Sequence, residues 1–489
     1  MQFGNARIII TIALLVSIVG PILSGSRVKA STPLSHGAES LSPDKVENLI
    51  TSYQIVDLGT LGGTQSFALD VNNNRQVTGN SLVTSEPGST GSLLRAYLWT
   101  SGSMTNLGPL PGAGTNRFAR GYAVNDAGTV VGEFNNDSSR AFVYTGGVMN
   151  GLTRLAGDND NGVAHDINNS NVIVGISSNG TASRPTMWTS NGMAYVPADL
   201  GSIAGTATST GRAWAINDAG VAVGLSQNAG ATSQATRWSG GTVTNLGSLG
   251  DGTRFGQAYG LNDNGLIVGA SQNGVTVGIL TGTSSTTPIT RAFRWQNGTM
   301  TELPPFNLYV SPGNTGPTTN YHSEAKDVND AGLIVGNSQR IASSPAVATA
   351  WINGFPVDLN TVIPAGSGWT LLSAEGINDQ GDIVGFGTFN GASRAFMLTA
   401  QPPSSSSFEV SGRVVTPDGR GLGRTELTMA FSDGSVRIAR PSSFGYYKFG
   451  NVPAGSIVVI SLISKGYSFQ SRTVLVDGEL TGVDFIAME

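Results

Sequence analysis

The stretch Ala258-Tyr-Gly-Leu-Asn-Asp-Asn-Gly-Leu-Ile-Val-Gly269 is one copy of a pattern that recurs along the chain. The pattern reads small-x-x-aliphatic-Asn-Asn/Asp-x-Gly-x-x-x-Gly, and a glycine follows the central Asn by seven residues in each of seven copies. The central residues are Asn72, Asn125, Asn168, Asn217, Asn262, Asn329 and Asn378. The paired glycines are Gly79, Gly132, Gly175, Gly224, Gly269, Gly336 and Gly385. A period of this kind indicates a repeat architecture, in which each unit buries its apolar side against its neighbours.

Each copy predicts four short antiparallel strands. The first ends on the central Asn, and a turn such as Asp263-Asn-Gly265 leads to the second, Leu266–Gly269. The third follows an Arg-Ala-aromatic pattern, as in Arg291-Ala-Phe-Arg-Trp295, and the fourth ends in a sequence such as Asn245-Leu-Gly247. Asn and Asp favour these turns by bonding their own backbone, and Gly supplies the positive φ. Four strands in a unit of about 40–50 residues predict a β-propeller blade.

The two ends of the repeat region are complementary. It opens with Tyr53-Gln-Ile-Val-Asp-Leu-Gly59, a fourth strand without the three before it, and it stops after a third strand, Arg394-Ala-Phe-Met-Leu398. Tyr53–Leu58 would complete the last unit and remove an exposed sheet edge. The sequence therefore predicts an all-β chain with a seven-bladed β-propeller over residues 53–400. The alternative is an open β-solenoid, whose repeats would be shorter.

Composition limits the class of protein. The 489 residues include 67 glycines, and only 12% are charged, against about 25% in an average protein. The absence of Cys excludes disulfides, thiolate catalysis and Cys-based zinc sites, and three His argue against a multi-His metal site. A formal net charge of −5 argues against nucleic-acid binding. We therefore expect no metal and no cofactor.

The N-terminus predicts export. Residues 1–30 resemble a secretory signal peptide, with Arg7, an apolar run over Ile8–Val19 and a small-x-small sequence at Val28-Lys29-Ala30. The apolar run is shorter than the roughly 20 residues that span a bilayer. An uncleaved anchor is the alternative. We expect a secreted or cell-envelope protein, of bacterial type, with no membrane span after cleavage and a lead-in segment over residues 31–52.

The repeats resemble the extracellular HAF-type repeat family, which takes its name from a His-Ala-Phe tripeptide in the third strand. Here that strand begins Arg-Ala-Phe or Arg-Ala-Tyr, as in Arg140-Ala-Phe and Arg95-Ala-Tyr, so the His is replaced. The resemblance covers roughly residues 53–400. It implies secretion, and it implies no established activity.

A different pattern follows residue 400. Gln401–Ser407 is a Pro/Ser linker by composition. Residues 408–489 contain several short alternating strands, which predict a small β-sandwich. The matches Gly412-Arg-Val, Pro417-Asp-Gly419 and Ser443-Phe-Gly-Tyr446 resemble the carboxypeptidase regulatory-like family, with its transthyretin-like fold. That resemblance implies an accessory spacer, binding or attachment module without catalytic residues of its own.

Candidate binding residues come from the variable parts of the repeat. Long loops are expected over Asn80–Leu94, Ser271–Thr290 and Pro304–His322, on the face opposite the short turns, and function concentrates on such loops. The residue three before the central Asn also varies. If the first strands line a channel, these residues would form a ring with Arg120 and Arg212 above it. The alternative is that they pack between blades or face solvent. The candidate residues are Tyr122, His165, Trp214, Tyr259, Lys326, Glu375, Arg120 and Arg212.

No phosphate loop, dinucleotide fingerprint, nucleophile elbow or zinc-protease motif is present. A paired-carboxylate enzyme would use Glu324, Asp327 and Glu375. Asp158 and Asp160 are spaced as in half of a calcium loop, but no later bidentate Glu follows, so an Asx-rich turn between blades is the favoured explanation. We expect a non-enzymatic binding or adhesion protein for a glycan or protein ligand. A secreted polysaccharide hydrolase or lyase is the alternative, and a structural envelope protein without a ligand is a third.

Overall fold

The computed structural model describes residues 52–488 with short gaps, and the predicted signal peptide and nearly all of the predicted lead-in segment lie outside the described residues. The gaps are residues 85–92, 110–117, 136–137, 159–160, 207–208, 279–285, 307–321, 340–344, 353, 402–406, 432–434, 465 and 477. The middle of the predicted linker therefore also lies outside the described residues. What is described is all-β, with one short 3-10 helix, η1 (Leu359–Thr361). No helix in this part of the chain is long and apolar enough to cross a membrane.

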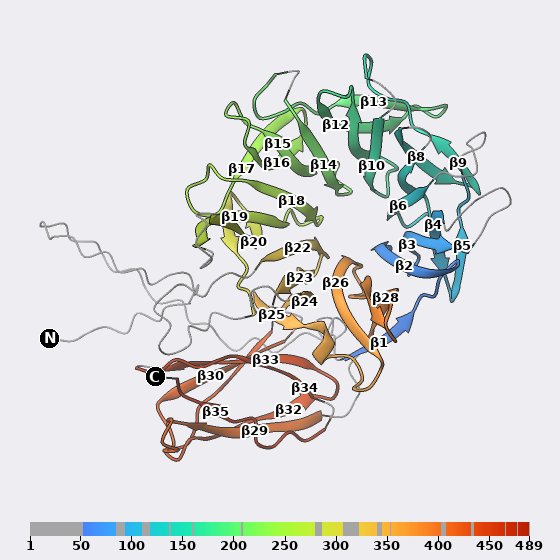
Figure 1. The fold of residues 1–489 in the computed structure, drawn as a ribbon. Coiled ribbons are helices and arrows are strands. Elements are labelled where there is room, and N and C mark those ends of the chain that lie inside the picture. The colour runs from blue at the N-terminus through green and yellow to red at the C-terminus, as the bar shows by residue number, and fades with distance from the viewer. Residues whose placement is uncertain are drawn as a thin grey trace, which may run out of the picture. The chain divides into compact units, whose positions relative to one another are not determined.

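The repeat region forms seven four-stranded antiparallel sheets in a β-propeller-like arrangement (Figure 1). The first three contain β2 (Gly62–Val71), β3 (Val77–Val83), β4 (Leu93–Thr100) and β5 (Ser103–Asn106); β6 (Ala119–Val124), β7 (Val130–Asn135), β8 (Ser139–Thr145) and β9 (Val148–Gly151); and β10 (Asn161–Ile167), β11 (Ile173–Ser178), β12 (Ser183–Ser190) and β13 (Tyr195–Asp199). The next three contain β14 (Gly211–Ile216), β15 (Ala222–Gln227), β16 (Ser233–Ser239) and β17 (Thr242–Gly247); β18 (Gly256–Leu261), β19 (Ile267–Gly278), β20 (Thr286–Gln296) and β21 (Thr299–Glu302); and β22 (Ser323–Val328), β23 (Ile334–Gln339), β24 (Ala346–Ile352) and β25 (Phe355–Asp358).

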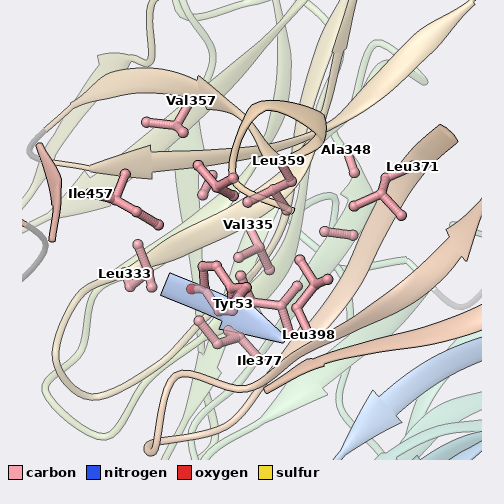
Figure 2. Close-up of a cluster of buried hydrophobic side chains, with 14 of the residues drawn as sticks. Tyr53, Leu333, Val335, Ala348, Val357, Leu359, Leu371, Ile377, Leu398 and Ile457 are labelled. Carbon is pink, nitrogen blue, oxygen red and sulfur yellow. The ribbon is translucent and has the colours of Figure 1, made fainter. Parts of the chain in front are cut away.

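The last repeat sheet is built from both ends of the region. Its strands are β26 (Trp369–Ile377), β27 (Ile383–Phe389), β28 (Ala392–Gln401) and β1 (Ser52–Asp57). β1 pairs antiparallel with β28, and Tyr53 lies opposite Ala400. Tyr53 is buried in an apolar cluster with Leu398 of β28 and Val335 of β23 (Figure 2). The expected pairing of the first strand with the last unit is therefore present, and it is held by apolar burial.

The central Asn of every repeat makes the same bonds. Its Oδ1 accepts a backbone N–H four residues later, at 2.8 to 3.0 Å, which closes the turn. Its Nδ2 donates to the backbone carbonyl of the central Asn in the next sheet, at 2.7 to 3.2 Å. The last of these bonds runs from Asn378 back to Asn72, so the set closes. Only an amide accepts and donates in this way, which explains the Asn.

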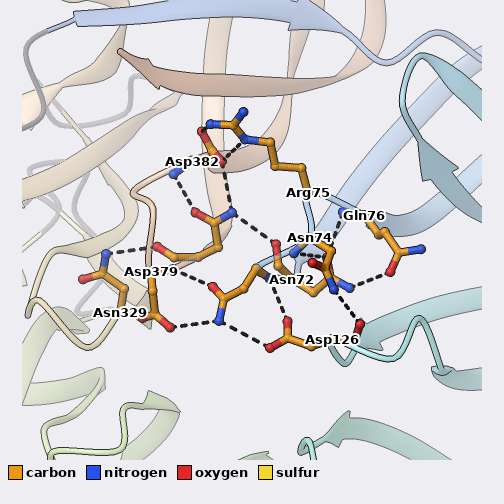
Figure 3. A network of polar contacts seen from close by, with 10 residues as sticks. Asn72, Asn74, Arg75, Gln76, Asp126, Asn329, Asp379 and Asp382 are labelled. Atoms are coloured by element: carbon orange, nitrogen blue, oxygen red, sulfur yellow. Dashed lines mark hydrogen bonds and ion pairs between the residues drawn. The ribbon is translucent and has the colours of Figure 1, made fainter. Parts of the chain in front are cut away.

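The residue after the central Asn forms a second closed set, and Figure 3 shows the part of it around Asp126 and Asp379. Each backbone N–H donates to the side-chain Oδ1 of the equivalent residue in the next sheet, at 2.8 to 3.0 Å. Asn or Asp both accept here, and the members are Asn73, Asp126, Asn169, Asp218, Asp263, Asp330 and Asp379. Turn propensity explains part of the repeat motif, and bonding between sheets explains the rest.

The expected loops need a correction. Strand β19 continues to Gly278 and β20 begins at Thr286, so much of the predicted loop over Ser271–Thr290 is a β-hairpin. The pairing resumes after a register shift between Gln272 and Thr276, because a bulge absorbs the extra residues. The predicted loop over Asn80–Leu94 likewise loses its ends to β3 and β4, and most of Pro304–His322 lies outside the described residues.

The C-terminal residues form two further sheets around one buried cluster that includes Val414, Met429, Phe449 and Ile460. The sheets contain β32 (Tyr446–Pro453), β29 (Ser407–Val415) and β35 (Phe485–Ile486); and β31 (Val436–Ala439), β30 (Thr425–Phe431), β33 (Ile457–Ser464) and β34 (Arg472–Leu475). The sequence pattern predicts β30 and β31 only weakly. Thr425-Glu-Leu-Thr-Met and Val436-Arg-Ile-Ala contain no aromatic residue, and the alternation of buried and partly buried residues in β30 stops at Met429.

Candidate functional site

The first strands of the seven repeat sheets surround a common axis, because each contacts the first strand of the sheet before and after it. These strands are β2, β6, β10, β14, β18, β22 and β26 (Figure 1). In every one of them the register with the second strand skips one residue. The skipped residues are Leu69, Tyr122, His165, Trp214, Tyr259, Lys326 and Glu375. The position that varies between repeats is therefore a β-bulge, which turns a side chain out of the ordinary alternation.

The repeat sequence builds this bulge from small residues. In β18 the residue before the bulge, Ala258, pairs with the repeat glycine Gly269. A Cβ on Gly269 would lie well inside 3.0 Å of the Gln257 carbonyl oxygen, and the six equivalent glycines are crowded in the same way. The bulge pushes this carbonyl toward the second strand, so only glycine fits there. The glycine that follows each central Asn by seven residues is thus explained by the bulge.

The bulge side chains form a continuous arc, made of Tyr122, His165, Trp214, Tyr259, Lys326 and Glu375, which we call the bulge arc. Ring centroids are 5.8 Å apart for Tyr122 and His165, 4.3 Å for His165 and Trp214, and 6.0 Å for Trp214 and Tyr259. The Lys326 ammonium lies 4.3 Å from the Tyr259 ring centroid. Aromatic and cation–π contacts of this kind link side chains on successive strands.

His165 is the supporting member of the arc. It is only 7% exposed, and its Nδ1 lies 2.8 Å from the Ala213 carbonyl oxygen in the next sheet. Burial lowers the pKa of His165 to about 4, so the ring is neutral at pH 7. Tyr122, Trp214 and Tyr259 on either side keep part of their surface accessible. The aromatic surface of the arc is therefore presented by these three residues, and His165 packs behind them.

The other end of the arc is charged. The Lys326 ammonium donates to Glu324 at 2.5 Å, and the Ser373 hydroxyl donates to Glu375 at 2.5 Å. Burial opposes the charge on Lys326, but Glu375, Tyr259 and Glu324 raise its pKa above the ordinary value. Burial raises the pKa of Glu375, although Lys326 and Ser373 oppose the rise. Lys326 is held as a cation between two carboxyl groups.

Arg120 and Arg212 occupy equivalent positions two residues before the bulge. Arg120 donates to Glu133 at 2.8 Å, and the Tyr122 hydroxyl donates to the same carboxylate at 2.9 Å. Arg212 lies with its guanidinium carbon 5.7 Å from the Trp214 ring centroid. Arg120 therefore forms an ion pair within its own sheet, whereas Arg212 packs against an aromatic ring.

In three of the sheets the residue directly after the bulge is an aspartate. Asp70, Asp166 and Asp327 each accept two backbone N–H bonds, one from the following residue and one from the next sheet, at 2.7 to 2.9 Å. Each retains some accessible surface but lies deep within the ring. Burial raises the pKa to about 8 for Asp70 and to about 6 for Asp166 and Asp327. Asp327, a candidate for catalysis, is thus engaged in joining β22 to β26.

Two hollows lie elsewhere in the repeat region. One, of about 210 Å³, is a shallow depression lined by the Asn–Asp turns of the seven sheets. The other, of about 530 Å³, is lined by Thr153, Asp158 and Trp188 among others. The Asp158 carboxylate lies 2.7 Å from an Arg184 nitrogen, which favours an ion pair over the calcium loop considered from sequence. Asp160 lies outside the described residues. No group of three or more potential metal ligands occurs in the part of the chain that the structure describes.

Comparison with known proteins gives distant likenesses of fold. No protein-family model matches the chain, and no curated protein matches it. A puromycin-hydrolysing peptidase of Mycobacterium tuberculosis matches with a TM-score of 0.39 and 11% identity, over 72% of this chain and 52% of that one. The β-propeller domain of the Trilobed protease from Pyrococcus furiosus matches with a TM-score of 0.37 and 8% identity, over 69% and 96%. The chain thus spans about half the length of the peptidase. Similarities at this level carry no argument about activity.

Proposed function

We propose that this chain is a secreted or cell-surface binding protein that holds a glycan or protein ligand on the bulge arc of a seven-bladed β-propeller. The architecture is supported by seven four-stranded sheets, by the pairing of β1 with β28 and by two hydrogen-bonded sets that return to their starting repeat. The predicted signal peptide supports export. In this proposal residues 53–400 are the propeller of HAF-type repeats, and residues 408–489 are a β-sandwich module of the carboxypeptidase regulatory-like type.

One observation carries the binding function. The repeat is uniform where it joins sheets, at the central Asn, the following Asx and the glycine, and it varies at the bulge. The bulge residues are also the ones that meet in one partly exposed arc of aromatic and charged groups. Aromatic surface beside a few fixed polar groups is typical of small-ligand sites. A uniform scaffold with one diverse, clustered position is expected of a recognition surface rather than of a spacer.

The test is a polysaccharide and protein screen of residues 31–489, scored for both retention and product release. Retention without products is expected. The triple variant Tyr122→Ala/Trp214→Ala/Tyr259→Ala should lose retention, since the aromatic surface of the arc is gone. The matched control is Phe444→Ala/Tyr446→Ala, which removes two aromatic residues, 71% and 61% exposed, at the start of β32 and in the turn before it. Retention that survives the arc variant and disappears in the control variant would move the site to the C-terminal module.

A second candidate, a polysaccharide hydrolase or lyase, is favoured by one feature. Glu375 belongs to the bulge arc, and burial and the nearby Glu324 raise its pKa while Lys326 opposes the rise. A general acid needs a raised pKa of this kind. This candidate predicts product release that Glu375→Gln abolishes while the variant keeps its melting temperature. The bonds of Asp327 to two backbone N–H groups make Asp327→Asn a stability variant rather than a catalytic one.

A further inference from the structure

The equivalent arginines Arg120 and Arg212 differ in the residue that each faces on the second strand. Arg120 pairs across the strands with Glu133, and Arg212 pairs at the same register with Leu225. Both partners directly follow the repeat glycine, Gly132 or Gly224. Glu133 is 6% exposed and accepts from Arg120, whereas Leu225 is 8% exposed and offers no acceptor. Replacement of an acid by leucine in one repeat therefore leaves a guanidinium without the acid that its counterpart has.

The surroundings of Arg212 keep it available. It is partly exposed, and the contact recorded for it within the described residues is the face of Trp214. The nearest charged groups along the arc are paired among themselves, Arg120 with Glu133 on one side and Lys326 with Glu324 on the other. His165, between the two sheets, is neutral at pH 7. Within the part of the chain that the structure describes, Arg212 is therefore a cation beside the bulge arc that is not paired with an acid.

We propose that Arg212 and Trp214 form a subsite for the carboxylate of an acidic glycan, such as a chain of uronic acid residues. The guanidinium presents two parallel N–H donors to a carboxylate, a geometry that a planar carboxylate fits and a neutral ester does not. Trp214 and Tyr259 both keep part of their surface accessible, so they supply apolar aromatic surface for a sugar ring next to the guanidinium. This inference rests on the proposed function, since it names the ligand class of the same arc.

The probes are polygalacturonate and its full methyl ester, which share a backbone and differ in the carboxylate. The wild-type chain should bind the acid about ten-fold more tightly than the ester, because a charge-assisted bond to a carboxylate is lost in the ester. Arg212→Gln should bring the two affinities together. Leu225→Glu should also bring the two affinities together, although Arg212 is still present. The new glutamate would pair with Arg212 as Glu133 pairs with Arg120.

Glu133→Gln tests the converse. It should release Arg120 and raise the affinity for polygalacturonate above that of the wild type, with little change for the ester. Melting temperatures of all variants would separate loss of binding from loss of fold. If Leu225→Glu does not fold, Arg212→Gln still tests the subsite, because Arg212 is partly exposed.

The outcomes separate the two proposals. Equal wild-type binding of the acid and the ester would overturn the carboxylate subsite and leave the binding function intact. Binding of neither, together with failure of every polysaccharide and protein in the screen above, would overturn both. Equal binding of dextran sulfate and polygalacturonate, both insensitive to Arg212→Gln, would show non-specific attraction of polyanions and overturn the subsite.

Discussion

The guanidinium Nε of Arg75 lies 2.7 Å from Oδ2 of Asp382, and this ion pair joins the first and last repeats across 307 residues of chain (Figure 3). Asp382 is fully buried and Arg75 is half-exposed. Arg75 stands where most repeats have glycine, and it takes the same left-handed conformation, with φ of 57°. Its turn bond to the Asn72 carbonyl is also preserved. The seam between the two ends of the repeat region is thus joined by this ion pair in addition to the bonds of the central Asn and the residue after it.

We expect Arg75→Gly to lower the free energy of unfolding by about 2 kcal/mol. Breaking a buried pair typically costs about 3–5 kcal/mol, and here the exposure of Arg75 and the relief of its positive φ offset part of that cost. Urea unfolding measures the change. The double variant Arg75→Gly/Asp382→Leu copies the residues found at the equivalent boundary, Gly332 and Leu266, and should recover the loss, because an apolar side chain replaces the buried charge. A single variant as stable as the wild type would show that the pair contributes nothing.

The central Asn should be far less replaceable than the Asx residue after it. Asn217→Asp keeps the acceptor for the Val221 N–H but loses the donor to the Asn262 carbonyl and buries a charge. We expect a loss of about 2–3 kcal/mol in unfolding free energy. The matched variant is Asp218→Asn, which repeats the residue found at Asn73 and Asn169 and should change stability by less than about 0.5 kcal/mol. Similar losses in both variants would contradict the donor argument.

Glycine opposite the bulge should tolerate no side chain. A Cβ at Gly224 would overlap the Arg212 carbonyl oxygen, so Gly224→Ala must shift one of two strands or abolish the bulge. We expect a loss of about 3 kcal/mol, at the upper end for overpacking. Gly450→Ala is the control, since nothing lies within 4 Å of its added Cβ. The two melting temperatures should differ clearly, and a stable Gly224→Ala protein would argue against the bulge.

The buried aspartates predict that stability falls as pH rises above neutrality. Their folded-state pKa values are raised by burial, to about 8 for Asp70 and about 6 for Asp166 and Asp327. The folded state therefore holds protons that the unfolded state has already lost. The resulting contribution to the unfolding free energy is fully present below pH 4, and it disappears as the pH rises through the folded-state pKa values. His165 has the opposite effect, but only below its ordinary pKa of about 6.5.

The measurement is the unfolding free energy between pH 6.5 and 9. Release of one proton per molecule changes it by at most about 1.4 kcal/mol for each pH unit, and Asp70 should account for most of the slope between pH 6.5 and 8. Asp70→Ala should flatten that slope, since it reproduces the alanine of the equivalent positions Ala123 and Ala215. An unchanged slope in this variant would assign the effect to other groups.

Sequence predicts well what is encoded within one repeat. The Asx-Gly turns and the strand alternation are local, so the four strands of each unit and the pairing of Tyr53–Leu58 with the end of the region follow from them. The bulge cannot be predicted from one repeat alone, because it depends on the register between two strands. In the sequence Tyr259 resembles any alternating strand residue. The bulge becomes visible only when Ala258 pairs with Gly269 and Gly260 pairs with Val268.

The same limit applies to the site. The variable position of the repeat can be found from the sequence, and the structure brings the side chains at that position together in the bulge arc. The separate role of each side chain depends on its neighbours in other sheets. His165 and Trp214 occupy equivalent bulge positions, but the surroundings bury His165 and leave Trp214 partly exposed. The contrast between Arg120 and Arg212 was present in the sequence, as Glu133 against Leu225, yet it becomes meaningful only when the strand register places each beside its arginine. The role of Asp70, Asp166 and Asp327 likewise depends on N–H groups of the next sheet.

The pairing of β1 with β28 has a consequence for how the molecule is made. The first described strand finds its partner only after nearly 350 further residues have been synthesised, since Ser52 pairs with Gln401. Contacts so distant in sequence are slow to form, and the emerging repeats have an unpaired edge until the last strand arrives. We therefore expect folding in a single late step once the chain is complete, and unfolding as one cooperative unit rather than repeat by repeat. A chain truncated before β28 would be a target for proteolysis, not a smaller version of the same domain.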